Sequence, residues 1–439
     1  MQRTILSFSI DNIQKTKEHL LLWSQQFDTV TWLDSNNFKQ QYSSFDCALA
    51  ADEFTSIKTD YYNAFEKLKE YQSITNDYIF GYISYDVKND VEQVSSKNFD
   101  GLDFADLFFF QPQKLIFIKG NTIEFHYLKM VDDEIENDFD VIKNYNEKNN
   151  FDDSFSKNSQ DNIKIKLRIH KDEYHSKVNK VLEHIKRGDI YEANFCQEFY
   201  AENSTINPIE VYKHLNDISE PPFAVFLKIE HQYLLSASPE RYIKKEGNKI
   251  ISQPIKGTAK RLRSKIDDDK IASDLARDLK ERSENVMIVD LVRNDLSKTA
   301  KIGSVKVEEL CKVYTFKQVH QMISTITSEI NQNTHPIDVL QSTFPMGSMT
   351  GAPKVSAMKI IENLEETKRG LYSGTVGYFT PNGNFDFNVI IRSILYNEEK
   401  KYISYSVGGA ITAKSIPEKE YEECLLKAKA MKYVLLNSK

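Results

Sequence analysis

One lysine, one glutamate next to a proline and two pairs of glutamates have types and spacings that suggest catalysis. Lys256 follows the apolar run Ile250–Ile255 and precedes Gly-Thr, so its side chain is expected to be partly desolvated. Desolvation disfavours the ammonium and lowers the pKa of a lysine, and a neutral lysine is a nucleophile. Glu240 follows Pro239, beyond the apolar run Tyr233–Leu235, and could move protons for that amine.

A hairpin without any catalytic role would account for the same residues. The two apolar runs flank a turn signal at Glu246-Gly247-Asn248. On that interpretation Lys256 is solvated and Glu240 lies on the surface. This stretch alone leaves both alternatives open.

The glutamate pairs have the spacing of neighbours on a helix. Glu281 and Glu284 are three residues apart in one expected helix, and Glu420 and Glu423 are three apart in another. If the two helices face each other, the carboxylates suit a hard cation such as Mg²⁺. Two solvated helix faces are the alternative, and the basic residues beside these glutamates fit it.

Arg392 and His320 lie in apolar surroundings. Arg392 falls within the apolar stretch 388–394. A buried charge without a partner is costly. Arg392 is therefore expected to bind either a substrate carboxylate, through a bidentate pair, or an internal acid. A lone histidine on an apolar strand, such as His320, is more often structural than catalytic.

The stretch Phe344–Lys354 is a glycine-rich loop that leads into a helix. A phosphate-binding P-loop needs its lysine to be followed by Ser or Thr, whereas Lys354 is followed by Val355. This mismatch argues against a nucleotide site. The backbone N–H groups at the helix start still suit an anion such as a carboxylate.

Composition narrows the class of protein. A net charge of -7 argues against a basic nucleic-acid-binding surface. No apolar run approaches the roughly 20 residues needed to cross a bilayer, so no membrane contact is expected. The four cysteines are scattered, which argues against a disulfide framework and a zinc site and favours a cytoplasmic location.

Hydrophobic periodicity predicts the elements that carry these residues. Helices are expected at 13–27, 61–71, 172–187, 268–291, after Pro353 with Val355, Met358, Ile361 and Leu364 facing inward, and at 417–436. Strands are expected at 78–85, 107–110, 115–118, 123–128, 163–169, 190–200, 222–229, 319–324, 372–379, 385–395 and 402–407. Pro112 is expected to separate the strands 107–110 and 115–118. Residues 144–162 are rich in Asn, Asp, Lys and Ser and are predicted to be a linker or surface excursion.

Together these stretches resemble the chorismate-utilising enzymes, which include anthranilate synthase component I, aminodeoxychorismate synthase component I, and the isochorismate and salicylate synthases. The resemblance is dense from about residue 163 to the end of the chain. It is carried by Arg-Gly-Asp-Ile-Tyr-Glu-Ala-Asn at 187–194, Ser-Pro-Glu-Arg at 238–241, Pro-Ile-Lys-Gly-Thr at 254–258, Ser-Glu-Asn-Val-Met-Ile-Val-Asp-Leu-Val-Arg-Asn-Asp at 283–295, Gly-Ser-Met-Thr-Gly-Ala-Pro-Lys at 347–354 and Val-Gly-Gly-Ala-Ile at 407–411.

Within that family the chain is most similar to the aminodeoxychorismate branch. Pro-Ile-Lys-Gly-Thr is the discriminating phrase, because anthranilate synthases typically have alanine where Lys256 stands. The water-activating lysine of isochorismate and salicylate synthases has no counterpart in Tyr191–Phe195. One departure is that Arg-Gly-Leu-Tyr at 369–372 also resembles the anthranilate form.

The resemblance implies a reaction and roles for particular residues. Chorismate would be aminated at C4 by ammonia to 4-amino-4-deoxychorismate, the first step toward para-aminobenzoate and folate. Lys256 would attack C2 while Glu240 protonates the departing C4 hydroxyl. Mg²⁺ would be held by Glu284 and Glu423, with Glu281 and Glu420 in support. Residues expected to bind the substrate are Arg392, Tyr372, Lys427, Gly408, Gly409, Ala410, Thr258, His320, Thr350 and Gly351.

The implied fold is α+β, like anthranilate synthase component I, with two large antiparallel β-sheets in a sandwich and helices packed outside. An amino-terminal region (1–143), the linker (144–162) and a chorismate-binding catalytic region (163–439) would form one intertwined fold. Because the chain has no Cys/His glutaminase pattern, ammonia is expected from a separate glutamine amidotransferase subunit. The alternatives are anthranilate synthase component I and a non-catalytic amidotransferase-binding protein.

Overall fold

Two long strands, β3 (Cys47–Thr59) and β5 (Leu107–Lys119), pair with each other and belong to two sheets at once. The computed structural model describes residues 2–38, 41–92, 94–145 and 163–437. The second half of β5 pairs with β6 (Thr122–Leu128), and its first half pairs with β4 (Ile79–Ile83). One sheet continues from each half, and every pairing between these strands is antiparallel.

The first sheet extends from β3 through strands of the carboxy-terminal part of the chain. Its outer edge beyond β6 is β1 (Arg3–Ser9). In the other direction the strands follow the order β2 (Thr29–Asp34), β9 (Phe223–Ile229), β10 (Gln232–Ser238), β19 (Ser393–Asn397), β20 (Tyr402–Thr412) and β8 (Glu192–Ala201), which also pairs with the short strands β7 (Lys166–Leu167) and β16 (Gly351–Ala352).

The second sheet extends from β4. Its strands follow the order β17 (Thr375–Phe379), β18 (Phe385–Asn388), β11 (Arg241–Glu246), β12 (Lys249–Gln253) and β15 (Val319–Glu329). The last of these also pairs with β13 (Ile255–Lys260) and β14 (Lys306–Thr315).

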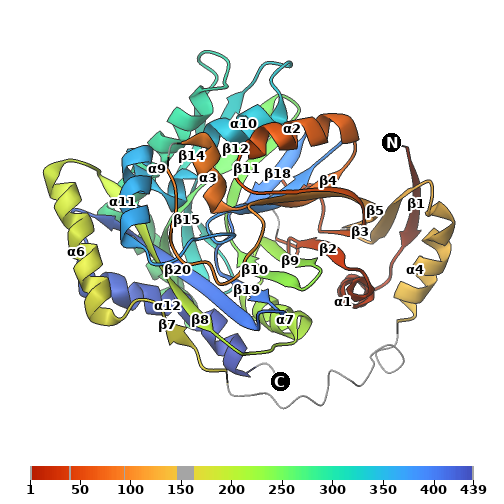
Figure 1. Cartoon of the computed structure of the whole chain (residues 1–439), viewed down its shortest axis with the longest axis horizontal. Helices are drawn as coiled ribbons and strands as arrows, with labels where there is room; N and C mark the ends of the chain where they lie inside the picture. Colours follow the sequence, from red (N-terminus) through yellow and green to blue (C-terminus); the bar gives the residue numbers. More distant parts are fainter. Residues whose placement is uncertain (1, 39–40, 93, 146–162, 438–439) are drawn as a thin grey trace.

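Helices cover the outer faces of both sheets (Figure 1). The first sheet carries α1 (Ile13–Trp23), α4 (Ile135–Lys143), α7 (Pro208–Ser219) and α12 (Pro417–Asn437), and α6 (Lys171–Arg187) and α11 (Lys354–Leu364) pack near β8. The others are α2 (Ala64–Thr75), α3 (Lys88–Val91), α8 (Lys265–Arg277), α9 (Leu279–Ser297) and α10 (Pro336–Thr343). Because α9 packs on β13, β14 and β15 while α12 packs on β20, the two helices cover different sheets.

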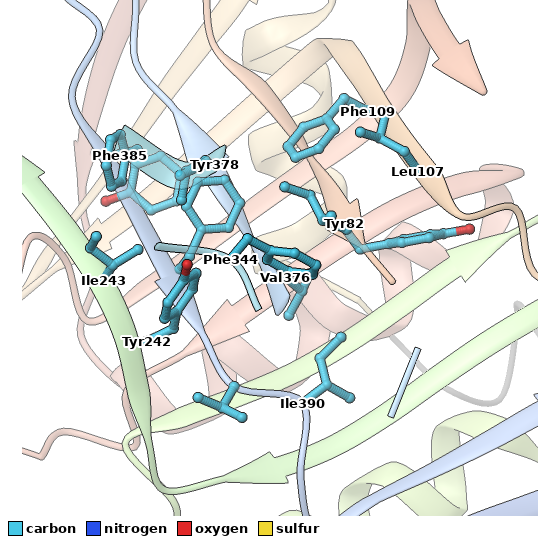
Figure 2. Packing of buried hydrophobic residues seen from close by; sticks show 14 of the residues in the cluster. Tyr82, Leu107, Phe109, Tyr242, Ile243, Phe344, Val376, Tyr378, Phe385 and Ile390 are labelled. Atoms are coloured by element: carbon cyan, nitrogen blue, oxygen red, sulfur yellow. The ribbon is translucent and has the colours of Figure 1, made fainter. Parts of the chain in front are cut away.

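Successive side chains of β3 point to opposite faces of the first sheet, which explains how both faces are buried. Ala48 and Ala50 belong to a cluster that joins side chains of both sheets, whereas Leu49 and Ala51 belong to a second cluster beneath the helices. Figure 2 shows side chains of the first cluster from β4, β5, β11, β17 and β18. Large apolar side chains therefore fill the space on both sides of the sheet.

The structure confirms the predicted α+β class with large antiparallel sheets. The segment 146–162, most of the predicted linker, lies outside the described residues, so the domain boundaries stay predictions. Across that boundary, β2 pairs with β9 and β4 pairs with β17. Within the described part of the chain, no helix is long and apolar enough to cross a membrane.

The prediction that Pro112 separates two strands was wrong. The strand β5 runs through it, because the proline lies where the neighbour of β5 changes. Pairing with β4 ends at Phe110 and pairing with β6 begins at Lys114, while β3 shifts register opposite Pro112. The missing N–H therefore costs no ladder hydrogen bond.

The predicted helix 268–291 is two helices. Asp278 adopts an extended conformation between α8 and α9, and its side chain accepts hydrogen bonds from the backbone N–H groups of Lys280 and Glu281. It is thus the N-cap of α9. On α11, Met358, Ile361 and Leu364 are buried as predicted, but Val355 is exposed, which corrects that prediction.

Two strand predictions also need correction. The predicted strand 385–395 is broken between β18 and β19, which lie in different sheets, and Arg392 adopts a left-handed φ of 55° at the crossing. The hairpin around Gly247 is formed by β11 and β12, whereas Tyr233–Leu235 lies in β10 and pairs with β9 and β19. The strand β11 was not predicted, because the charged residues Lys244, Lys245 and Glu246 interrupt its apolar pattern.

Replacing Leu227 by alanine should lower the free energy of unfolding by about 2–5 kcal/mol, because this fully buried side chain belongs to the cluster joining the two sheets. Leu426→Ala, at an exposed position of α12, is the matched control and should change it by less than about 0.5 kcal/mol. Urea unfolding followed by tryptophan fluorescence measures both values. Equal losses for the two variants would contradict the assigned packing.

Candidate active site

Lys256 lies where the two sheets approach each other. It is on β13 of the second sheet, and its Nζ donates a hydrogen bond of 2.8 Å to Oε1 of Glu192, the first residue of β8 in the first sheet. The side chains of Lys256 and Glu192 are 12% and 1% exposed. The alternative of a solvated lysine is therefore wrong, and the lysine forms a buried ion pair.

The expectation that burial leaves Lys256 with a lowered pKa was also wrong. Burial does act against the ammonium, but the carboxylates of Glu192, Glu284 and Glu240 outweigh it and raise the pKa of Lys256. The resting lysine is therefore charged. To act as a nucleophile it must first give a proton to another group.

Glu240 lies between β10 and β11, buried beside Lys256. The backbone N–H of Ile255 approaches its Oε1 at 3.5 Å. Burial raises the pKa of Glu240 to about 7, against the opposing effects of Ser348, Ile255 and Lys256. A carboxyl group that keeps its proton near neutral pH can act as a general acid, so the environment suits the predicted role.

The four predicted metal ligands face one another across the site. Glu281 and Glu284 lie on α9, and Glu420 and Glu423 lie on α12, each within electrostatic range of Lys280. The Nζ of Lys280 lies 3.7 Å from Oε1 of Glu284, a buried oxygen that makes no hydrogen bond within the described part of the chain. The helices thus bring both pairs together. Glu420 and Glu284 are largely buried and Glu281 is half-buried, whereas the side chain of Glu423 is 47% exposed, so the solvated alternative holds for that residue alone.

The pKa values reflect this crowding of acids. Burial, with the negative charges of Glu281 and Glu192 nearby, raises the pKa of Glu284 to about 7. Burial also raises the pKa values of Glu281 and Glu420. The pKa of Glu423 is lowered, because Lys427, Lys280 and Lys256 outweigh the effect of burial. The site would accept an additional positive charge.

The chemistry of these donors fits magnesium. Among residues 2–38, 41–92, 94–145 and 163–437, no three acidic, histidine or cysteine side chains converge on one metal position. Mg²⁺ commonly uses only one or two protein carboxylates and fills its remaining positions with water and substrate oxygens. The buried oxygen of Glu284 that makes no hydrogen bond within the described part of the chain suits this role, and Glu423 on α12 is the predicted second ligand. Metal binding stays a prediction.

Two cations, Lys427 and Arg392, lie beside the glutamates and contact backbone carbonyls. The Nζ of Lys427 is 2.7 Å from Oε1 of Glu423 and donates to the carbonyl of Gly408 at 2.8 Å, and Nη1 of Arg392 donates to the carbonyl of Lys427 at 3.3 Å. Burial lowers the pKa of Arg392, which has Tyr372 and Glu423 nearby. Its guanidinium forms no ion pair within the described ranges. This arrangement suits an anionic ligand.

Glycines allow the backbone to approach closely at two places. Gly408–Ala410, which were predicted to bind the substrate, belong to β20 and pair with β8. A Cβ on Gly408 would lie 2.3 Å from Sγ of Cys196, and a Cβ on Gly351 would lie 2.1 Å from the carbonyl of Glu192. Gly351 also has a φ of 152°, and Thr350 before it is fully buried. These contacts fix the strand that carries Glu192.

His320 and Thr258, which were predicted to bind the substrate, differ from each other in their exposure to solvent. His320 is buried, with Nε2 3.0 Å from Asp268 and Nδ1 3.0 Å from Thr315, so both ring nitrogens already have partners. Thr258 is exposed on β13. A role for either residue in substrate binding stays a prediction.

Glu192, Lys280 and Ser348 were not singled out from the sequence, although they complete the site. Glu192 lies within the phrase 187–194 and is one of two acids, with Glu198, in strand β8, so an acid in a predicted strand of the resemblance is the signal that could have identified it. Lys280 was interpreted as support for a solvated helix. Ser348 acts on Glu240 through a side-chain hydrogen bond, and no pattern around it indicates this contact.

Comparison with known proteins gives consistent matches over most of the chain. The family described as chorismate binding enzyme matches residues 19–433. Anthranilate synthase component 1 of Aquifex aeolicus is 32% identical over 363 residues, covering 80% of this chain and 73% of that protein. Aminodeoxychorismate synthase component 1 of Escherichia coli is 42% identical over 253 residues, covering 58% of this chain and 55% of that protein. The second alignment thus spans little more than half of the relative's length.

A crystal structure of another protein has a similar fold. Anthranilate synthase component I from Streptococcus pneumoniae superposes with a TM-score of 0.76 at 23% identity, covering 90% of this chain and 95% of that one. At this identity the likeness establishes the arrangement of sheets and helices.

Glu284→Gln should stabilise the fold at alkaline pH. The pKa of Glu284 is 4.5 in the unfolded chain and about 7 in the folded chain, so between these values the unfolded chain ionises first and the folded state loses stability progressively up to about pH 7. The variant should gain roughly 1–3 kcal/mol at about pH 8 and nearly nothing at about pH 5, in buffer without divalent cations. Urea unfolding at both pH values measures this, with exposed Glu422→Gln as the control. A pH-independent difference would contradict the assignment.

Proposed function

The chain belongs to the chorismate-binding enzymes, and we propose that it aminates chorismate at C4 with ammonia to give 4-amino-4-deoxychorismate. Lys256, held 2.8 Å from Glu192 inside the acidic site, is the observation that carries this proposal. A lysine nucleophile accounts for two successive displacements, which a single hydrolysis does not need. Support also comes from the 42% identity to a protein named aminodeoxychorismate synthase component 1.

Chorismate carries two carboxylates, and the site offers two matching regions. Arg392, Lys427 and the backbone N–H groups of Gly408–Ala410 would bind the enolpyruvyl carboxylate, with Tyr372 beside them. An arginine that has no internal acid as an ion-pair partner within the described ranges is suited to a bidentate contact with a ligand. Burial would strengthen that contact, because few water molecules compete with it.

The ring carboxylate would lie near the two glutamate pairs. Glu284 and Glu423 would hold Mg²⁺, with Glu281 and Glu420 in support, and the bound ion would supply Lewis-acid polarisation of this carboxylate. The residues of the chain then determine where protons go. Glu240, with its pKa raised to about 7, keeps a proton for the leaving hydroxyl.

The bond changes balance over two displacements. The amine of Lys256 forms a bond to C2 as the C4–O bond breaks, and the hydroxyl leaves as water with the proton of Glu240. Ammonia then bonds to C4 and the bond between Lys256 and C2 breaks. Glu240 regains a proton from the new C4 ammonium, so the sum is chorismate and ammonia giving 4-amino-4-deoxychorismate and water.

The ammonia would come from a separate glutamine amidotransferase, because the relatives named component 1 imply a second component. The second candidate is anthranilate synthase component I, since the Aquifex aeolicus relative aligns over a larger share of this chain. A catalytically inactive partner of an amidotransferase is the third. The product formed separates all three.

We expect the purified chain with Mg²⁺, chorismate and an ammonium salt to form 4-amino-4-deoxychorismate, identified by liquid chromatography and mass spectrometry. Anthranilate together with pyruvate as the main product would select the second candidate. Unconsumed chorismate in the presence of a tightly bound amidotransferase would select the third. A parallel reaction with EDTA in place of Mg²⁺ should lose activity.

Lys256→Ala should abolish the covalent adduct that the chain forms with chorismate when ammonia is withheld, because no other amine would occupy the position of attack. Intact-protein mass spectrometry after rapid quenching measures the adduct. Lys260→Ala, at an exposed position of the same strand, is the control and should keep it. An adduct that persists without the Lys256 amine would remove this residue from the nucleophile role.

A further inference from the structure

We propose that Glu192 is the group that takes the proton from Lys256 before attack and returns it after the second displacement. This role rests on the proposed function, in which Lys256 is the nucleophile. It adds a sixth acid to the site, with a task different from those of Glu240 and the four glutamates proposed to hold the metal.

The geometry of Glu192 is that of a proton acceptor with one free oxygen. Its Oε1 accepts the hydrogen bond from Nζ of Lys256 at 2.8 Å. Its Oε2 is buried and makes no hydrogen bond within the described part of the chain. Lys256 is also the only cation within 4.0 Å of this carboxylate among the described residues. A buried carboxylate with a single partner is strongly tied to it, because an unpaired charge there is costly.

The backbone of Glu192 is fixed independently of Lys256. The residue pairs with Thr412 of β20 on one side and with Ala352 of β16 on the other. Gly351 approaches its carbonyl so closely that a Cβ there would lie 2.1 Å away. The acceptor therefore stays in place while the lysine moves toward a substrate.

The other charged groups around Lys256 are engaged otherwise. Glu240 faces it from the turn before β11, Glu284 from α9 and Glu423 from α12. Glu240 must keep its proton for the leaving hydroxyl, and Glu423 pairs with Lys427. Glu284 lies beside Lys280 rather than within ion-pair distance of Lys256. Glu192 is therefore the acceptor in direct contact.

The proton balance closes with this assignment. Before attack, the ammonium of Lys256 gives one proton to Glu192, leaving a neutral amine and a protonated carboxyl. After ammonia expels Lys256 from C2 as a neutral amine, Glu192 returns the proton and the ion pair re-forms. No external base is needed, so the lysine is reset within the site.

Glu192→Gln tests the pairing without any substrate. The full-length chain is pulsed with acetic anhydride across a pH series, in EDTA and again in Mg²⁺, and acetylation of Lys256 is measured by peptide mass spectrometry. Removing the carboxylate should lower the midpoint pH of Lys256 labelling by about one unit or more. Glu366→Gln, which removes one of the two carboxylates paired with Lys177 instead, is the matched control and should leave the midpoint of Lys256 labelling unchanged. An unchanged midpoint in Glu192→Gln would overturn the proposal.

The rate of adduct formation with chorismate tests the transfer itself. Between about pH 5 and 6.5, below the pKa of about 7 at which Glu240 loses its proton, the natural chain should show a nearly level rate. Glu192→Gln should instead gain about tenfold per pH unit, because its amine must lose a proton to solvent before attack, and Glu192→Asp should restore part of the level profile. A loss that is equal at every pH would mean a purely structural role and overturn the proposal. A shifted labelling midpoint without any adduct would reject the proposed function and leave the pairing intact.

Discussion

A buried ion pair between the two sheets is the interaction on which this site depends. Lys256 belongs to the second sheet and Glu192 to the first, and each would be an uncompensated buried charge without the other. The pair therefore constrains how far the sheets can move apart at this edge. It also determines the resting charge of the lysine, because Glu192 is the nearest of the carboxylates that raise its pKa. The Lys256–Glu192 ion pair therefore affects both the packing of the two sheets and the charge of the proposed nucleophile.

The positions of the other site residues follow from chain crossings between the sheets. β3 and β5 take part in both sheets, which brings the amino-terminal part of the chain into the same hydrogen-bonded network as the catalytic strands. Arg392 sits where the chain leaves β18 in one sheet for β19 in the other. The carbonyl of Arg392 still accepts a hydrogen bond from the N–H of Ala237 in β10. Its side chain is oriented by contacts such as the hydrogen bond to the carbonyl of Lys427.

Much of this fold and site could be predicted from the sequence, because the informative signals are local or belong to recognisable phrases. Glu240 and the four helical glutamates were identified that way and lie together. The direction of the pKa shift of Lys256 could not be predicted, since its partner Glu192 is 64 residues away in the chain. The end of α8 was missed because Asp278 is an unremarkable charge until its capping contacts are known. The effect of Pro112 on β5 could not be predicted, because it depends on which strand pairs with β5 at that residue.

The double pairing of β8 at residue 192 has an evolutionary consequence. Hydrogen bonds to β20 and β16, and the glycine at 351, fix the backbone here whatever side chain it carries. A substitution at this position therefore exchanges one functional group for another while the scaffold keeps its shape. Related chains could acquire a different chemistry at the same coordinates by a single codon change. Divergence of reaction type within such a fold needs no rearrangement of its sheets.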